Sequence, residues 1–223
     1  MKMDLTVLIP HMGVLADGAL LTAQISALSL IGSILMGAII AVARTSSSSA
    51  VRRAAYIYVD LFRNIPFIVQ LFFFYYGLPV IGIYIDGVTT GVIALSISAG
   101  AYASDAIRSG ILAIDTGVFE AAEVSGLSKR VVFTRIVLPI ALRTSIKPLG
   151  AVLVNMILTS SVLSTITVNE LTGQAKIVAS NTFRPFEVYV VLLVVYATLT
   201  WLLSLGVDLL HRALNRDLQQ QEA

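Results

Sequence analysis

Five long runs of this sequence contain no charged residue, and their spacing constrains the fold more than any other feature. The runs are residues 18–43, 64–85, 87–104, 148–169 and 188–207. A helix needs about 20 apolar residues to cross the hydrocarbon core of a bilayer. No alternation of period two supports a barrel, and lipid cannot satisfy an open backbone. The sequence therefore predicts an all-α integral membrane protein with five transmembrane helices.

Composition supports a lipid environment. Of the 223 residues, 57% are hydrophobic and 13% are charged, whereas an ordinary soluble domain is about 25% charged. A soluble fold of this size exposes too much surface to hide that apolar excess. Cysteine is absent and the two histidines, His11 and His211, lie at opposite ends, so no disulfide or metal site is predicted. The net charge of +2 is too small to indicate binding of nucleic acid.

Basic residues gather in alternate segments, and this pattern orients the chain. One side of a five-span arrangement holds Arg44, Arg52, Arg53, Arg63, Arg108, Lys129, Arg130, Arg135, Arg143, Lys147, Arg212 and Arg216. The opposite side holds only Lys2, Lys176 and Arg184. Because Lys and Arg accumulate in cytoplasmic loops, the N-terminus is expected outside and the C-terminus inside.

We expect residues 1–223 to form a single transmembrane domain. The five spans are expected at about 18–43, 56–82, 87–107, 146–169 and 187–210. The segment of about 108–145 would then lie in the cytoplasm between spans three and four. No internal repeat supports an inverted-repeat secondary transporter.

The cytoplasmic segment contains the pattern of a short helix. Asp115 or Thr116 can cap its N-terminus, and Glu120 lies early in the helix, where negative charge suits the dipole. Gly126 can end it in a left-handed C-cap. A second helical stretch is expected from Ser128, and Pro139 and Pro148 are expected to kink or break the helix beyond it.

This segment resembles the EAA loop of the permeases of ABC importers, in which EAA, three residues, G, nine residues and I-x-L-P succeed one another. The matching residues are Glu120, Ala121, Ala122, Gly126, Ile136, Leu138 and Pro139. The resemblance implies that Glu120, Ala121, Ala122, Gly126, Leu138 and Pro139 couple the chain to an ABC ATPase subunit. No phosphate-binding glycine loop followed by Lys-Ser or Lys-Thr occurs in the sequence. ATP and Mg²⁺ are therefore expected on that partner, and this chain is expected to be a transport subunit that binds no cofactor.

The wider sequence, over about 14–216, resembles the polar amino-acid uptake branch (histidine, glutamine and arginine type) of the binding-protein-dependent inner-membrane permeases. The similar stretches are residues 63–79, 100–111 and 182–187. This resemblance implies a multi-pass protein in the bacterial inner membrane, surrounded by lipid. It also implies a second permease copy or paralogue and an external solute-binding protein as partners.

Two departures from the branch pattern bear on the substrate. Asp105 stands where the branch usually has Glu, and residues 158–162 read Leu-Thr-Ser-Ser-Val where Lys-Asp-Thr-Ser-Leu is usual. A charged pair is thus replaced by Leu158 and Thr159. The change indicates a different substrate or pairing with a different second permease.

Polar residues inside spans are expensive, so they are candidates for the substrate pathway. These candidates are Gln70, Asn155, Thr159, Ser160 and Ser161. The alternative is hydrogen bonding between helices or back to the same helix. Gating or structural roles are expected for Arg63, Pro66, Asp105 and Arg108. For Arg63, contact with the substrate or snorkelling to the membrane interface are the alternatives. Ser96, Gly100 and Ser104, four residues apart, indicate a close-packing helix face.

Two other functions remain open at this point. The chain could belong to an importer of another small solute, or act as a channel or secondary transporter without ATP. A membrane enzyme would need clustered acid–base or metal residues, and no Ser–His–acid set is plausible with histidines only at the ends.

Overall fold

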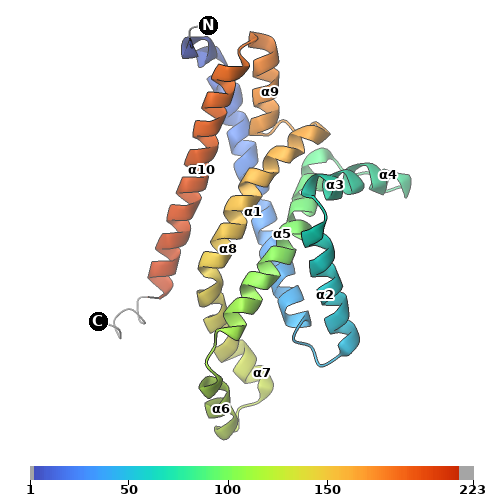
Figure 1. Ribbon diagram of the computed structural model, residues 1–223, viewed down its shortest axis with the longest axis vertical. Helices are drawn as coiled ribbons and strands as arrows, with labels where there is room; N and C mark the ends of the chain where they lie inside the picture. The colour runs from blue at the N-terminus through green and yellow to red at the C-terminus, as the bar shows by residue number, and fades with distance from the viewer. Residues whose placement is uncertain (1–2, 216–223) are drawn as a thin grey trace.

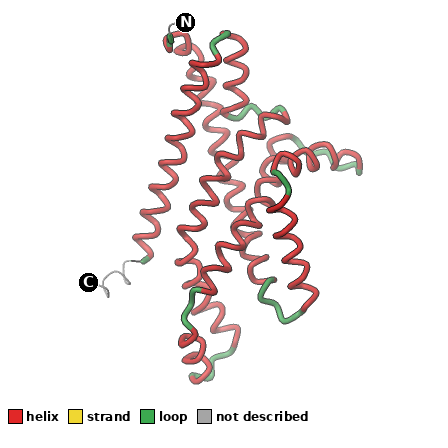
Figure 2. Tube along the Cα trace, viewed as in Figure 1, coloured by secondary structure: helices red, strands yellow, loops and turns green. Residues whose placement is uncertain are grey.

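The computed structural model describes residues 3–215, and those residues fold into helices joined by short loops, without a strand (Figure 2). Lys2 and Arg216, which contribute to the orientation argument, lie outside the described residues. The all-α expectation is confirmed for the described part of the chain.

The helices differ widely in length (Figure 1). The four long ones are α1 (Met12–Ala43), α5 (Gly87–Leu112), α8 (Leu138–Ser160) and α10 (Pro185–Leu214). The shorter ones are α2 (Ser49–Asn64), α3 (Phe67–Phe72), α4 (Leu78–Val80), α6 (Thr116–Val124), α7 (Lys129–Val132) and α9 (Leu171–Thr182). Turns of 3₁₀ helix cover Leu5–His11 and Ser161–Ile166, and π-helical turns cover Phe73–Gly77 and Phe133–Val137.

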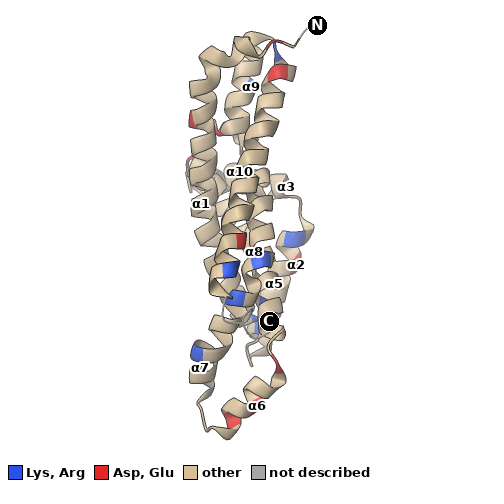
Figure 3. Cartoon of the chain, turned by 90° about the vertical axis from the view of Figure 1, so that its left-hand side faces the viewer, with Lys and Arg blue, Asp and Glu red and all other residues tan. Residues whose placement is uncertain are grey.

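Four helical segments are long and apolar enough to cross a membrane: Leu5–Ala43, Gly87–Leu112, Arg130–Ile166 and Pro185–Leu214. A fifth crossing results if the helix pair Ser49–Asn64 and Phe67–Val80 forms one broken span, bent by 107°. Figure 3 shows Lys and Arg concentrated toward the half of the molecule that holds α2 and α7.

The stretch 56–82, expected as one span, is interrupted at Ile65 and Pro66. Ile65 has extended backbone angles, with φ −98° and ψ 130°. Proline disfavours the α conformation in the preceding residue and has no N–H to continue the helical ladder. The sequence Ile65-Pro66 therefore ends α2, and α3 leaves it at a steep angle.

Pro139 and Pro148 do not end the helix that contains them, which runs from Arg130 to Ile166. Of the two outcomes expected there, a kink or a break, the break does not occur. The π-helical turn Phe133–Val137 lies directly before Leu138-Pro139, and Phe73–Gly77 lies in the same place before Leu78-Pro79. A wider turn shifts the hydrogen-bond register, which helps the helix to accommodate a residue without an N–H.

Helices α1 and α5 pack with almost no space between their backbones. A Cβ atom added at Gly37 would lie 2.7 Å from the Cβ of Ala103, and one added at Gly100 would lie 3.0 Å from the Cβ of Met36. Ser104 is fully buried. The close-packing face expected at Ser96, Gly100 and Ser104 is therefore confirmed.

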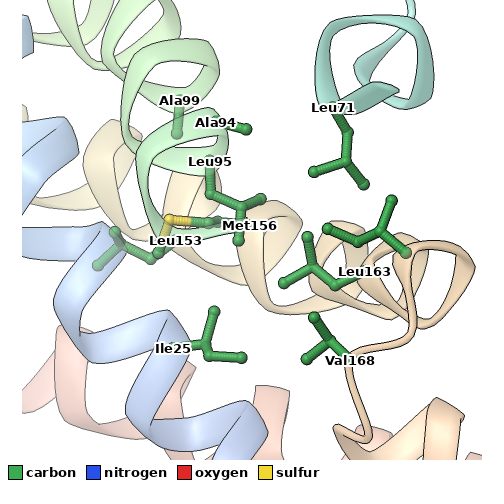
Figure 4. Packing of buried hydrophobic residues seen from close by; sticks show 10 residues of the cluster. Ile25, Leu71, Ala94, Leu95, Ala99, Leu153, Met156, Leu163 and Val168 are labelled. Carbon is green, nitrogen blue, oxygen red and sulfur yellow. The ribbon is translucent and has the colours of Figure 1, made fainter. Parts of the chain in front are cut away.

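A hydrophobic cluster joins four helices near the bent pair (Figure 4). Ile25 comes from α1, Leu71 from α3, Leu95 from α5 and Met156 from α8. Leu71 and Leu95 are essentially inaccessible to solvent. In a bilayer, side chains of this kind hold helices together through van der Waals packing, so the cluster fixes α3 against α5 and α8.

The turn before α5 is capped locally. Asp86 Oδ1 accepts a hydrogen bond of 3.0 Å from the backbone N–H of Thr89. Hydrogen bonds from the hydroxyl and the backbone N–H of Thr89 lower the pKa of the Asp86 carboxyl. Gly82, with φ +82°, closes the turn that leads to this cap.

Candidate functional site

Helix α6 begins and ends where local chemistry requires. Asp115 Oδ1 accepts a hydrogen bond of 2.7 Å from the backbone N–H of Gly117. Gly126 has φ +66°, and its N–H donates to the carbonyl of Glu123 while the Leu127 N–H donates to the carbonyl of Ala122. These two bonds form a Schellman motif. The short helix expected from the sequence, with its left-handed cap at Gly126, is confirmed.

Helix α6 projects from the end of the bundle, away from α9 and the N-terminus (Figure 1). Glu120 and Ala121 are exposed, whereas Ala122 is buried against the rest of the chain. Val124 is 91% exposed, and Phe119 and Leu127 are also exposed. A short helix that shows apolar side chains beside an acidic one offers a surface for a protein partner.

A small hydrophobic cluster ties this projection to α8. Ile114 precedes α6, Val118 lies in it, and Val137 and Ala141 lie at the base of α8. A cavity of about 680 Å³ beside the cluster is lined by Phe119, Glu123, Leu127 and Phe133, among others. Leu138 is half-buried and Pro139 exposed at the start of α8. The six residues of the EAA pattern thus fall on two elements, α6 with its cap and the base of α8.

Two of the expected pathway residues, Asn155 and Thr159, lie together on α8. Thr159 Oγ1 donates to Asn155 Oδ1 at 3.2 Å. Both line a cavity of about 300 Å³ between α3, α5 and α8. Its lining residues are Phe67, Leu95, Ser98, Ala99, Tyr102, Ala151, Val152, Asn155, Met156 and Thr159. A second space of about 320 Å³ shares five of them and adds Arg63 and Pro66.

Gln70, Ser160 and Ser161 each donate a hydrogen bond to a carbonyl that is close to them in the sequence. Ser160 Oγ donates to the carbonyl of Ile157 at 2.6 Å and Ser161 Oγ to that of Leu158 at 2.7 Å. Gln70 is buried, and its Nε2 donates to the carbonyls of Phe62 and Ile65. Back-bonding, the alternative considered for polar residues in spans, describes the contacts of Ser160 and Ser161, whereas Gln70 bonds across the break to the end of α2.

Asp105 bridges two arginines. Its Oδ1 accepts from Arg44 and its Oδ2 from Arg63, each at 2.5 Å. The Arg44 side chain is only 7% exposed, whereas that of Arg63 is 47% exposed. Pro66 is the N-cap residue of α3, and Arg108 lies half-buried one turn beyond Asp105.

Arg44 was not among the expected site residues. It counts in the sequence only as a basic residue after the first apolar run. The sequence does contain a signal for this ion pair. Asp105 is an acidic residue that ends another apolar run, and a carboxylate at the edge of a span usually pairs with a cation. The sequence alone does not say which of several arginines supplies it.

A second buried carboxylate, Glu170, joins three helices. It caps α9 by accepting from the backbone N–H groups of Thr172 and Gly173 at 2.9 and 3.0 Å. It also accepts from the hydroxyl of Thr22 in α1 at 3.2 Å and from that of Tyr196 in α10 at 3.1 Å. In the sequence, Glu170 is marked only as the charged residue that ends the apolar run 148–169. Within residues 3–215, no three His, Cys, Asp or Glu side chains gather as metal ligands would.

The chain is similar to known transport proteins. Residues 33–220 match the family described as "Binding-protein-dependent transport system inner membrane component". The probable glutamine ABC transporter permease protein GlnM of Bacillus subtilis (strain 168) is 35% identical over 96% of this chain and 99% of that protein. The glutamine transport system permease protein GlnP of Escherichia coli (strain K12) is 32% identical over 95% of this chain and 98% of that protein.

A solved structure is similar over nearly the whole chain. It is described as the crystal structure of an amino acid ABC transporter with histidines. It superimposes with a TM-score of 0.89 at 31% identity, covering 96% of this chain and 100% of the other. The chain belongs to the family of inner-membrane components of binding-protein-dependent transport systems.

Proposed function

We propose that this protein is the transmembrane permease subunit of an ATP-driven importer for a polar amino acid, in the bacterial inner membrane. The observation that carries the proposal is the continuous helix Arg130–Ile166. One end of it packs against the EAA helix α6. Farther along, Asn155 and Thr159 line the cavity beside α3 and α5. One continuous helical segment thus connects a surface fit for an ATPase with a space fit for a small polar solute.

The corresponding mechanism is alternating access. The partner ATPase would bind ATP and Mg²⁺, and closure of its dimer would carry α6 with it. Because α6 is packed on the base of α8 through Val118, Val137 and Ala141, movement of α6 would be transmitted along α8. A solute is moved only if its affinity differs between the inward-facing and outward-facing states. This chain would bind neither nucleotide nor metal.

The cavity chemistry favours a small zwitterion held by few contacts. Ser98, Tyr102, Asn155 and Thr159 provide hydroxyl and amide groups within an otherwise apolar lining. Such groups can donate hydrogen bonds to a polar amino acid and accept them from it, without placing an unpaired charge of the protein in the cavity. The relatives named for glutamine support this class of substrate. A second permease copy or paralogue and an external solute-binding protein would complete the complex, with the N-terminus of this chain outside.

The test is purification of the tagged chain from its native membrane, followed by identification of the proteins that come with it. Wild type and Ser47→Asp, a change in an exposed loop, should retain an ATPase subunit. Gly126→Asp should lose it, because the substitution places a negative charge at the C-terminal end of α6, beside Glu123, where the helix dipole disfavours one. Recovery of wild type without any ATPase would overturn the proposal.

Uptake distinguishes the remaining alternatives. Uptake of labelled glutamine should be abolished in Gly126→Asp and retained in Ser47→Asp. Unchanged uptake in Gly126→Asp would favour a channel or secondary transporter. A complex that retains its ATPase but imports only a solute of another class would favour the alternative importer.

A further inference from the structure

Two guanidinium groups share one carboxylate beside the cavity, and they hold it unequally. Arg44 is nearly buried, stacks over the ring of Tyr56 at 4.7 Å, and also donates to Ser104 Oγ at 3.4 Å. Arg63 is 47% exposed and lies 5.4 Å from the ring centre of Tyr102. Arg44 is therefore a fixed partner of Asp105, and Arg63 is the partner with freedom to move.

The trio carries one uncompensated positive charge, since Arg44 and Arg63 together face the single carboxylate of Asp105. If Arg63 turned away, Asp105 would keep its bond to Arg44. The Asp105 carboxylate would therefore not be left unpaired away from water, and such unpaired charges are what make most broken ion pairs costly. Arg63 can thus exchange one carboxylate for another at low cost.

Arg63 also lies where a solute would meet it. It lines the same space as Asn155 and Thr159 from α8 and Ser98 and Tyr102 from α5. Among the described residues that line this space and the adjoining one, Arg63 alone carries a charge. A planar guanidinium binds a carboxylate through two parallel hydrogen bonds, which a neutral hydroxyl cannot do.

We propose that Arg63 receives the α-carboxylate of the transported amino acid, and that Asp105, held by Arg44, occupies Arg63 when no substrate carboxylate does. This proposal rests on the amino-acid importer function proposed above and names the substrate group that Arg63 recognises. Substrate binding would replace the Arg63–Asp105 pair by an Arg63–substrate pair. That exchange would free α5, which carries Asp105, from α2, which carries Arg63.

Lys147 is the competing candidate for the carboxylate. It lines a neighbouring groove between α8 and α10 that also includes Asn155. The carboxyl of Asp208 lines the same groove, so a second carboxylate there would meet a like charge. Arg63 also faces a carboxylate, that of Asp105, but Arg44 holds that carboxylate as well, and the planar guanidinium of Arg63 fits a carboxylate ligand better than an ammonium does.

The experiment measures equilibrium binding of labelled L-glutamine to the permease–ATPase complex in nanodiscs, without the binding protein. Unlabelled L-glutamine and L-glutaminamide, in which the α-carboxylate is an amide, serve as competitors. Wild type should be competed by glutamine and much less by glutaminamide. Arg63→Gln should weaken glutamine binding about 10- to 100-fold, the range for loss of hydrogen bonds to a charged group, and should lose the preference over glutaminamide. Arg63→Lys should be intermediate, and Arg53→Gln, an exposed cation on the same helix, should match wild type.

The outcomes separate this inference from the proposed function. If the complex assembles and binds glutamine, but Arg63→Gln binds it as tightly as wild type, the inference alone fails. It also fails if Lys147→Gln loses the carboxylate preference instead, or if glutaminamide competes as well as glutamine against wild type. If wild type binds neither glutamine nor any other labelled amino acid, the amino-acid function and the inference fail together.

Discussion

The side-chain amide of Gln70 donates a hydrogen bond of 2.7 Å to the carbonyl oxygen of Ile65, across the break between α2 and α3. The same Nε2 atom donates to the carbonyl of Phe62 at 2.9 Å. In a continuous helix that carbonyl would accept from residue 66, which is proline and has no N–H. Gln70 thus replaces the hydrogen bond that Pro66 cannot make, and it holds the two halves of the bent pair together.

Replacement of Gln70 should therefore loosen the break. Gln70→Leu keeps the size of the side chain but leaves two carbonyls without their donor, which costs about 1–3 kcal/mol. We expect a lower unfolding temperature of the purified protein in detergent and reduced uptake. The neighbouring exposed Val69→Ala should change neither. Equal stability of Gln70→Leu and wild type would contradict this role.

The two arginines on Asp105 should differ sharply in their effect on stability. Arg44→Gln leaves the partly buried carboxylate of Asp105 with only Arg63, its more exposed partner. Loss of the buried guanidinium should lower the free energy of unfolding by about 3 kcal/mol. Arg63→Gln removes an exposed partner and should cost less than about 1 kcal/mol. Thermal unfolding of the two variants in the same detergent measures the difference. The ranking would be wrong if both lowered the unfolding temperature equally.

Glu170 should be essential for the position of α9. Glu170→Ala removes the acceptor of four hydrogen bonds, which come from Thr22, Thr172, Gly173 and Tyr196. We expect the free energy of unfolding to fall by about 2–4 kcal/mol. Glu170→Gln turns an amide NH₂ toward a backbone N–H but keeps one oxygen acceptor. Its free energy of unfolding should therefore fall by less than that of Glu170→Ala. Chemical denaturation of the purified protein tests the order.

A matched control is available for that measurement. Glu123→Ala removes an exposed carboxylate from α6 and should leave the denaturation midpoint unchanged. A midpoint for Glu170→Ala that coincides with the control would rule out the proposed tie between α1, α9 and α10.

The left-handed conformation of Gly126 predicts a graded series of substitutions. Asn visits this region more readily than other non-glycine residues, whereas a β-branched residue is strained there by more than about 1 kcal/mol. Gly126→Asn should keep most of the co-purifying ATPase, and Gly126→Val should lose it. The yield of ATPase relative to tagged permease is the measurement. Equal retention by both variants would show that the cap is dispensable for docking.

The absence of cysteine makes a direct test of the bent pair possible. Ser47 precedes α2 and Tyr84 follows α4, and both are exposed. If the pair crosses the membrane with the N-terminus of the chain outside, a membrane-impermeant thiol reagent should label Tyr84→Cys in intact cells. Ser47→Cys should be labelled only after permeabilisation. Labelling of both from one side would mean that α2–α4 does not cross.

Much of this architecture follows from short-range chemistry in the sequence. The spacing of charges marks the apolar helices, because a charged side chain in lipid is costly wherever it stands. The ends of α6 follow from Asp115 and Gly126, since capping depends on residues within one turn. The EAA spacing, which indicates the family, is likewise local. These features need no knowledge of what lies far away in the chain.

The tertiary structure alone decided the roles of the polar residues. Gln70, Ser160 and Asn155 look alike as polar residues in apolar runs, yet Gln70 and Ser160 bond to nearby carbonyls whereas Asn155 lines a cavity. Which side chain faces which neighbour depends on how helices distant in sequence pack. For the same reason the sharing of Asp105 by Arg44 and Arg63, 61 and 42 residues away along the chain, became visible only once α1, α2 and α5 were placed together.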